Sequence, residues 1–319
     1  MDVIDPIAFF ERCWPASDLY DKQREILRSL RDNYETVVPA GNGLGKDYIT
    51  AVACLWWMCS RSPARVVTTS VKGDQLQDVL WGEIRHLIKS SEVAMPLQYN
   101  HMQIRQLDNA GEFIPKSELV GQVCNQNEGL LGRHLPNDIP RTLVCFDEAS
   151  GIRTEVYNSS LTWAHRVLVI GNPFPCENFF KQSVKEGDKR SAIDDSLRRK
   201  VVKIKATDSP NVKLAFVELL KGDRKPLEVL IRTEDQPFGI YSEEEYERLM
   251  EMWIKKGRPN PPLKTAVPGL ITYQQYIERR SSWNAMLQCI SVDGEFYEGA
   301  ETKMFPPEWL NASEIAAIS

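Results

Sequence analysis

The chain has 319 residues, of which 42% are hydrophobic and 26% charged, and its formal net charge is −5. This composition is typical of a globular protein of one or two domains, and it excludes a disordered, collagen-like or low-complexity chain. The longest apolar run, 49–59, is shorter than the ~18–20 residues that cross a bilayer, so we expect a soluble protein with no membrane partner. Seven cysteines without a C-x-x-C pair and four scattered histidines predict reduced thiols and no structural transition metal.

The first part of the chain alternates between helical and strand-like patterns. These patterns predict helices over 6–12, 19–31, 49–58 and 74–89. They predict strands over 36–38 and 65–69. The strand at 36–38 runs into a glycine-rich turn, and the helix after that turn is apolar nearly all round. This order of elements predicts a parallel sheet with right-handed crossovers.

The later elements complete the predicted sheet and then change in character. Alternating residues over 97–123, with a turn at 109–111, predict an antiparallel hairpin laid on the sheet. Further strands are predicted over 142–146, 166–170 and 200–205. Amphipathic helices are predicted over 242–256 and 272–280. We therefore predict an α/β fold with a mostly parallel sheet flanked by helices. The predicted domain boundary after Asp208 divides the chain into 1–208 and 209–319.

Residues 40–47 match the phosphate-loop pattern Ala/Gly-x-x-x-x-Gly-Lys-Ser/Thr at every position except the last. Glycines let successive backbone N–H groups face an anion, and the lysine reaches the β and γ phosphates. The predicted nucleotide-binding residues of this loop are Gly41, Asn42, Gly43, Leu44, Gly45, Lys46 and Asp47. Asp47 stands where a hydroxyl normally binds magnesium, so either this carboxylate is a Mg²⁺ ligand or it turns away and a water replaces it.

Further candidate residues follow the predicted strands. Asp147 and Glu148 come directly after the strand at 142–146; Asp147 is suited to the Mg²⁺ shell, and Glu148 to deprotonating the attacking water. Asn172, after the next strand, can either sense the γ phosphate or simply form an Asn-Pro turn. Gln23 can pair with N6 and N7 of adenine, although glutamines are common on helix surfaces.

A basic segment is the main feature of the charge distribution. Residues 181–205 hold nine basic residues against four acidic ones. Such a segment either presents one face to a phosphate backbone or forms a solvated loop and strand edge.

Taken in order, these motifs resemble the ATPase part of the large terminase subunit of tailed bacteriophages. The resemblance rests on Gln23, GNGLGKD at 41–47, VVTTSVKGDQLQDVLWGEI at 66–84, GLLGRH at 129–134, LVCFDEAS at 143–150, LVIGNP at 168–173 and DSPNV at 208–212. It implies a RecA-like phosphate-loop core with a small helical lid or linker subdomain, and ATP and Mg²⁺ as cofactors. It also implies adenine contact by Gln23, phosphate binding by Lys46, magnesium at Asp147, catalysis by Glu148 and coupling through 171–173.

The resemblance further implies partners and a cellular place. In that family a homo-oligomeric ring binds the portal protein of a procapsid in the cytoplasm of the infected bacterium. It drives double-stranded DNA inward, aided by the small terminase subunit. A neighbour's arginine can complete the active site; since 42–44 lack the arginine of many members, Arg133 is the first candidate, with Arg141 and Arg153 as alternatives. The family's nuclease domain would begin about where this chain stops, so no nuclease activity is expected.

Two other functions fit part of the pattern. A nucleotide-gated assembly module that binds ATP but barely hydrolyses it is suggested by Asp47. A superfamily 2 helicase-like ATPase also has an upstream glutamine and an acidic box, but the part after Asp208 looks too short and too helical for the second RecA-like domain that it needs.

Overall fold

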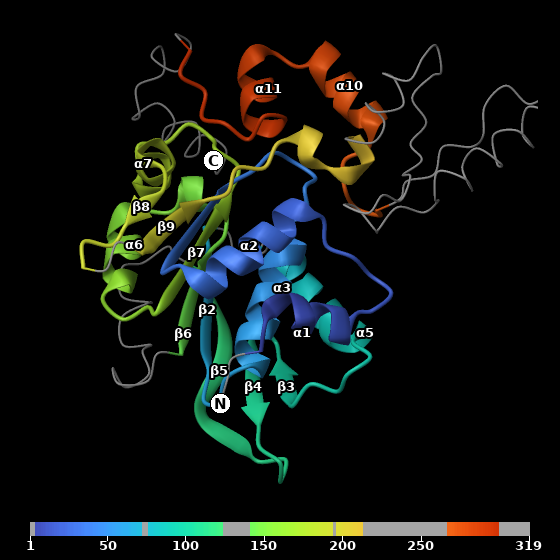
Figure 1. The fold of residues 1–319 in the computed structure, drawn as a ribbon, viewed down its shortest axis with the longest axis vertical. Coiled ribbons are helices and arrows are strands. Elements are labelled where there is room, and N and C mark those ends of the chain that lie inside the picture. The colour runs from blue at the N-terminus through green and yellow to red at the C-terminus, as the bar shows by residue number, and fades with distance from the viewer. Residues whose placement is uncertain (1–3, 72–75, 124–140, 194–195, 213–266, 300–319) are drawn as a thin grey trace, which may run out of the picture.

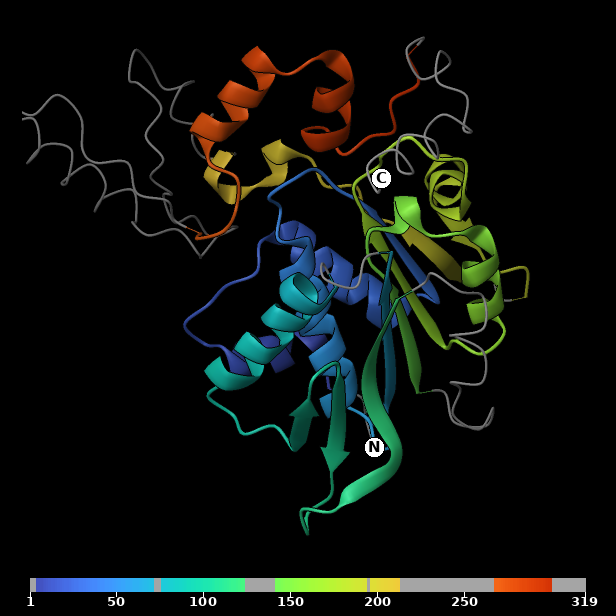
Figure 2. The same cartoon turned by 180° about the vertical axis from the view of Figure 1, so that it is seen from behind.

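The computed structural model describes residues 4–71, 76–123, 141–193, 196–212 and 267–299. Its described strands form one nine-stranded sheet in the order β3-β4-β5-β2-β6-β7-β1-β9-β8. Helices α1, α2, α3 and α5 cover one face of the sheet, and α6 and α7 cover the other (Figures 1 and 2). The predicted α/β fold with a mostly parallel sheet is confirmed.

The strands are β1 Glu35–Pro39, β2 Arg65–Ser70, β3 Leu97–Asn100, β4 Gln103–Leu107, β5 Phe113–Val123, β6 Thr142–Phe146, β7 Arg166–Gly171, β8 Lys189–Arg190 and β9 Leu197–Val201. The helices are α1 Pro6–Cys13, α2 Asp21–Asp32, α3 Lys46–Cys59, α5 Trp81–Ser90, α6 Thr154–Leu161, α7 Phe179–Glu186, α10 Tyr273–Ser282 and α11 Ala285–Ser291. Three short turns of helix complete the set: η1 Leu76–Leu80, η2 Ala149–Gly151 and η3 Ala206–Asp208.

The strand order decides where the functional loops meet. Strands β5, β2, β6, β7, β1 and β9 are parallel, whereas β3, β4 and β8 extend the two edges antiparallel. Strand β7 lies between β1 and β6 and pairs with both. The carboxyl ends of these three strands therefore lie side by side, facing α10 and α11 (Figure 1). We call this the carboxyl edge of the sheet and the opposite one its amino edge.

Burial on both faces explains the apolar sequence runs. Every residue of β1, β2 and β6 is buried, as expected for parallel strands between two helical layers. Helix α3 is buried from Ile49 to Met58, because it packs between the sheet and helices α1, α2 and α5. On the other face, the rings of Tyr157 and Phe179 stack at 4.1 Å. The core thus holds β1, β6 and α3, which carry the phosphate loop and the acidic pair.

Several elements differ from the sequence prediction. The segment 97–123 joins the sheet as three strands, because β5 pairs with β2 as well as with β4. The helix expected over 74–89 begins as the π-helical turn η1, although 72–75 are not among the described residues. The last strand is β9 rather than 200–205, with Ile204 making only an isolated bridge to Ala40. The helix expected over 242–256 lies outside the described residues.

Other expectations concern solubility and cysteine chemistry. No helix within the described ranges is long and apolar enough to cross a membrane. The cysteines that the structure describes are free thiols. Helix α10 forms close to the predicted 272–280, capped by Thr272 and Gln275 in a reciprocal capping box. The domain boundary after Asp208 stays a prediction.

Candidate nucleotide-binding site

The phosphate loop joins β1 to α3. Gly43 and Gly45 have φ values of +74° and +70°, a left-handed conformation that strongly favours glycine. The first helical hydrogen bond runs from Ile49 N–H to the Gly45 carbonyl. Over 43–47, the backbone N–H groups have no backbone acceptor among the described residues. These free donors at a helix N-terminus form an anion-binding cradle.

Two segments far along the chain hold the start of this loop. Gly41 N–H donates to the Ile204 carbonyl at 3.0 Å, and Asn42 N–H donates to the Ser291 carbonyl at 2.8 Å. A Cβ atom on Gly41 would lie 2.7 Å from that Ser291 oxygen. The close approach explains the glycine, and the contacts fix the loop against the end of α11.

Lys46 is buried and connects the loop to the tip of β7. Its Nζ donates to the Gly41 carbonyl at 3.2 Å and to Asn172 Oδ1 at 3.0 Å. Asn172 Nδ2 in turn donates to the Ala40 carbonyl at 2.7 Å. The structure therefore brings Asn172 and Lys46 together, 126 positions apart in sequence. A phosphate that drew Lys46 away would change the contacts of Asn172.

Carboxylates gather beside this lysine. Asp147 is 3% exposed, and burial, followed by the charges of Asp47 and Glu148, raises its pKa to about 8. Lys46 and the backbone N–H of Glu148 act in the opposite direction. The three predicted acidic residues thus share one site. Glu148 also has a φ of +51°, which is uncommon for a residue with a Cβ and often found at functional sites.

The donor set fits a hard divalent cation. Asp147 and Asp47 offer carboxylate oxygens, and a cation would relieve the repulsion that raises the pKa of Asp147. No three His, Cys, Asp or Glu side chains of the described ranges form a complete metal-binding group. Mg²⁺ commonly uses one or two protein carboxylates and takes its other ligands from water and substrate phosphates. The residues present therefore suit magnesium bound together with a nucleotide.

Gln23 lies against the loop rather than on an open surface. It is 3% exposed, and its Nε2 donates to the Gly45 carbonyl at 3.5 Å. Tyr20, just before α2, donates its hydroxyl proton to the Leu44 carbonyl at 2.8 Å. Sequence reasoning missed this tyrosine, because nothing in its local pattern indicates a partner in the loop. The adenine contact of Gln23 stays a prediction.

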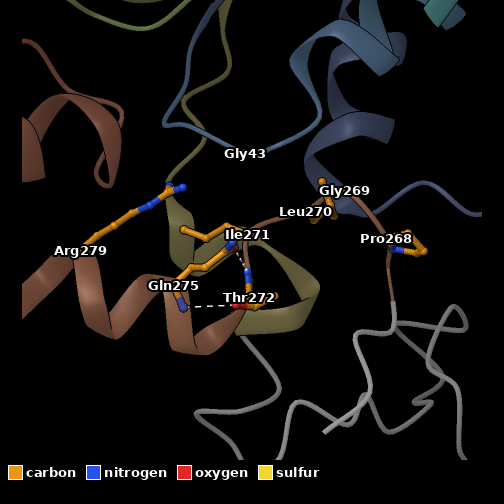
Figure 3. Close-up of a pocket in the computed structure, with 8 residues that line it drawn as sticks. All are labelled: Gly43, Pro268, Gly269, Leu270, Ile271, Thr272, Gln275 and Arg279. Carbon is orange, nitrogen blue, oxygen red and sulfur yellow. Dashed lines mark hydrogen bonds between the residues drawn. The ribbon is translucent and has the colours of Figure 1, made fainter.

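A cavity of about 470 Å³ adjoins the loop on the side of α10 (Figure 3). Its lining residues are Gly43, Pro268, Gly269, Leu270, Ile271, Thr272, Gln275 and Arg279. Ile271 N–H donates to the Gly43 carbonyl at 2.7 Å, so this segment is attached directly to the loop. The cavity therefore borders the phosphate loop at Gly43.

Arg279 was not predicted as a site residue. It extends from α10, and its Nη1 donates to the Asn42 carbonyl at 3.0 Å, while its guanidinium carbon lies 5.1 Å from the Trp283 ring centre. Burial lowers its pKa, and no carboxylate of the described ranges forms an ion pair with it. Two cationic side chains, Lys46 and Arg279, thus hold the consecutive carbonyls of Gly41 and Asn42.

The arginines proposed from sequence differ in where they stand. Arg133 is outside the described residues. Arg141 precedes β6 at the amino edge, where its carbonyl accepts from Arg65 N–H. Arg153 is exposed at the start of α6. Arg141 therefore lies at the edge opposite Lys46, whereas Arg153 follows Glu148 on the carboxyl side of β6.

Among the described residues, ion pairs form at four of the nine basic residues of the segment 181–205. Arg199 is 8% exposed, and it donates to Glu35 at 2.5 Å and to Glu186 at 2.8 Å. Further ion pairs join Lys181 to Glu177, Lys200 to Asp188, and Lys203 to Glu295. The charge of Arg199 therefore belongs to the fold, and whether the rest of the segment faces a phosphate backbone stays a prediction.

A P-loop nucleotide-binding fold is defined by three features of this sheet. They are the loop between β1 and α3, the acidic pair after β6, and strand β7, which lies between β1 and β6. No family model and no curated protein matches the chain. Among solved structures, the large terminase ATPase domain of Thermus phage P74-26 is 14% identical, with a TM-score of 0.51 over 91% of this chain and 98% of that one. The large terminase of bacteriophage HK97 is 12% identical, with a TM-score of 0.45 over 82% of this chain and 54% of that one. The match to the P74-26 domain shows that the chain has the RecA-like fold of a terminase ATPase domain, as the resemblance predicted.

Proposed function

We propose that this chain is the ATP-hydrolysing motor of a phage DNA-packaging terminase. The observation that carries the proposal is the meeting of Lys46, Asn172 and the acidic group of Asp47, Asp147 and Glu148 under one glycine-rich loop. A cation for the phosphates, carboxylates for a metal and a base for water are the parts that nucleotide hydrolysis requires.

Each residue has a role in the proposed reaction. The N–H groups of 43–47 and the ammonium group of Lys46 bind the β and γ phosphates. Asp147, and Asp47 either directly or through a water, would hold Mg²⁺, which neutralises phosphate charge when bound. Glu148 accepts a proton from the attacking water. Asn172, through its bond to Lys46, passes the state of the γ phosphate to β7, and Gln23 contacts adenine.

The transition state also needs positive charge beyond that of one lysine. Arg279 can supply it within the same chain, because its guanidinium already contacts the loop at Asn42. We retain Arg133 as the first candidate for an arginine supplied by a neighbouring subunit, with Arg141 and Arg153 as alternatives. The supply of an arginine by a neighbour is tested by co-assembling Arg133→Ala and Glu148→Gln proteins. The mixture should recover part of the ATP hydrolysis that each protein lacks alone.

The proposed setting follows from the terminase fold. The chain would act in the cytoplasm of the infected bacterium as a homo-oligomeric ring on the portal protein, with the small terminase subunit and double-stranded DNA as partners. Residues 1–208 would form the ATPase core, and 209–319 a lid or linker subdomain. Contacts of Ser291 and Ile271 with the loop support a lid role for the later segment.

The decisive test is phosphate release from ATP by the purified 319-residue chain. We expect hydrolysis with Mg²⁺ and none with excess chelator. Lys46→Ala should abolish hydrolysis and weaken nucleotide binding, because the phosphates lose their buried cation. Lys89→Ala is the matched control, since Lys89 is exposed on α5. Equal turnover by the Lys46→Ala protein would contradict the assignment of this site.

A second candidate is a nucleotide-gated assembly module. It is favoured by Asp47 lying close enough to Asp147 to raise the pKa of that residue, which disfavours binding of a triphosphate unless a cation intervenes. Tight ATP binding with no phosphate release, both alone and with duplex DNA, would select this function over the motor.

A further inference from the structure

Three arginines lie together at the amino edge of the sheet, opposite the nucleotide site. Arg61 precedes β2, Arg141 precedes β6 and Arg166 opens β7, and these are neighbouring strands. Arg65 N–H donates to the Arg141 carbonyl at 2.9 Å, and Leu143 pairs in register with Arg166. The sheet therefore sets the three positions next to one another.

Aromatic rings and carbonyl groups hold two of these side chains. The guanidinium carbon of Arg61 lies 3.5 Å from the Trp57 ring centre and 4.6 Å from that of Trp56. Trp57 Nε1 donates to the Arg141 carbonyl at 2.9 Å, and the Arg141 guanidinium donates to the Ser62 carbonyl. These contacts orient the cations without neutralising them.

The cluster lacks an anion. Among the described side chains, no carboxylate forms an ion pair with Arg61, Arg141 or Arg166. Burial, followed by the charges of Arg166 and Arg141, lowers the pKa of Arg61. The acid whose charge acts on Arg166 is Asp32, which is itself paired with Arg31. Partly buried charges are normally paired, so this arrangement suits an external anion.

The positive charge continues along the same edge. Glu35 of β1 pairs in register with Val167 and with Arg199, so Tyr34 lies beside Arg166 on one side and Arg198 on the other. Arg198 is exposed, and its guanidinium carbon lies 4.6 Å from the Tyr34 ring centre. From β6 to β9 is three strand spacings, about 14 Å at about 4.8 Å each.

We propose that this arginine edge, formed by Arg61, Arg141, Arg166 and Arg198, binds the phosphate backbone of duplex DNA. The edge spans about 14 Å from β6 to β9, and about 19 Å from β2, which Arg61 precedes. Both spans equal the axial rise of several phosphates of one strand at about 3.4 Å each, and both exceed what a single inorganic phosphate occupies. Guanidinium groups suit phosphate oxygens because they donate two parallel hydrogen bonds. Such contacts fix the position of the duplex without reading its bases. The inference rests on the proposed function as a DNA motor and assigns it a DNA-facing surface.

The test is the salt dependence of duplex binding by the full 319-residue chain. Fluorescence anisotropy with a labelled duplex gives the slope of log K against log salt. Arg141→Gln combined with Arg166→Gln should flatten that slope by about two, and Arg198→Gln alone by about one. The effect should be equal for duplexes of different sequence. Arg12→Gln combined with Arg28→Gln is the control of equal charge, because both residues are exposed on α1 and α2.

Unchanged slopes in the edge variants, or an equal loss in the control, would overturn the inference. If the double variant fails to fold, the exposed Arg198→Gln variant decides alone. Displacement of the duplex by inorganic phosphate beyond that by chloride at equal ionic strength would indicate a single-anion site and also overturn it. Phosphate release by the wild-type protein tests the motor function separately, so either idea can fail without the other.

Discussion

The two edges of the parallel sheet gather opposite charges by similar means. At the carboxyl edge, burial and neighbouring carboxylates raise the pKa of Asp147. At the amino edge, burial and neighbouring guanidinium groups lower the pKa of Arg61. Strand β6 separates them with five residues, about 16 Å at about 3.3 Å each, too far for side chains of the two edges to form ion pairs. The two edges are therefore separate sites: the carboxyl edge suits a divalent cation bound together with a nucleotide, and the amino edge suits an anion.

Replacing Glu148 gives the largest expected effect and tests whether the carboxyl edge performs chemistry. Glu148→Gln should lower turnover by about two to four orders of magnitude, because the amide cannot accept the proton of the attacking water. Nucleotide binding, measured with a fluorescent ATP analogue, should persist. Glu155→Gln is the control, as Glu155 is exposed on α6. Wild-type turnover by the Glu148→Gln protein would remove Glu148 from the mechanism.

Replacing Arg199, the ion-paired arginine at the amino edge, tests whether it differs in structural role from the arginines there that have no ion pair with a described residue. Arg199→Met leaves Glu35 buried with only the Tyr157 hydroxyl at 2.5 Å as a partner. We expect a loss of about 3 kcal/mol in the free energy of unfolding. Arg198→Gln should change it by less than about 0.5 kcal/mol. Urea denaturation measures both, and equal losses would show that the two arginines are not structurally distinct.

Removing Asp47 tests the metal role of the carboxyl edge. Asp47→Ala should raise the magnesium concentration for half-maximal hydrolysis by about tenfold, and Asp47→Ser should restore much of the affinity. A magnesium titration of phosphate release measures this shift, with Asp78→Ala as an exposed control. An unchanged titration curve would mean that Asp47 is not part of the metal shell.

Replacing Arg279 should have an effect no larger than that of replacing Asp47. Arg279→Ala should lower the hydrolysis rate by about tenfold, since one hydrogen bond to a charged group is lost. Arg279→Lys, which keeps the charge but loses the planar donor geometry, should lie between this variant and wild type. Steady-state phosphate release compares the three proteins. If Arg279→Ala does not change the hydrolysis rate, Arg279 does not supply the positive charge, and that charge must come from a neighbouring subunit.

Local sequence patterns predicted the elements that position the site. The strands carrying the loop and the acidic pair are short apolar runs bounded by polar residues, and such runs form buried parallel strands. Because parallel strands end at one edge, the pattern also indicated that Asn172 and Asp147 lie near Lys46. The strand expected over 200–205 was placed too late, because β9 is Leu197–Val201 and the apolar Val202 and Ile204 are buried without belonging to it.

Contacts between distant segments could not be predicted. Arg279 lies 237 positions from Asn42, and nothing near it in sequence distinguishes it from Arg280, which pairs with Asp293. The arginine edge could not be predicted for the same reason. Its residues come from segments that are far apart in sequence, and only the strand order brings them together. Arg199 shows the converse: it belongs to a basic run in sequence and to a buried ion pair in the fold.

The attachment of the loop to α11 has a consequence for the order of events during synthesis. Asn42 leaves the ribosome long before Arg279 and Ser291, which supply its donor and acceptor partners. At about 5–20 residues per second, the 237 positions that separate Asn42 from Arg279 take about 10 to 50 s to translate. Throughout that interval the nascent chain can form its sheet while the loop lacks these contacts. The loop thus gains these contacts only after residues 279–291 have been translated.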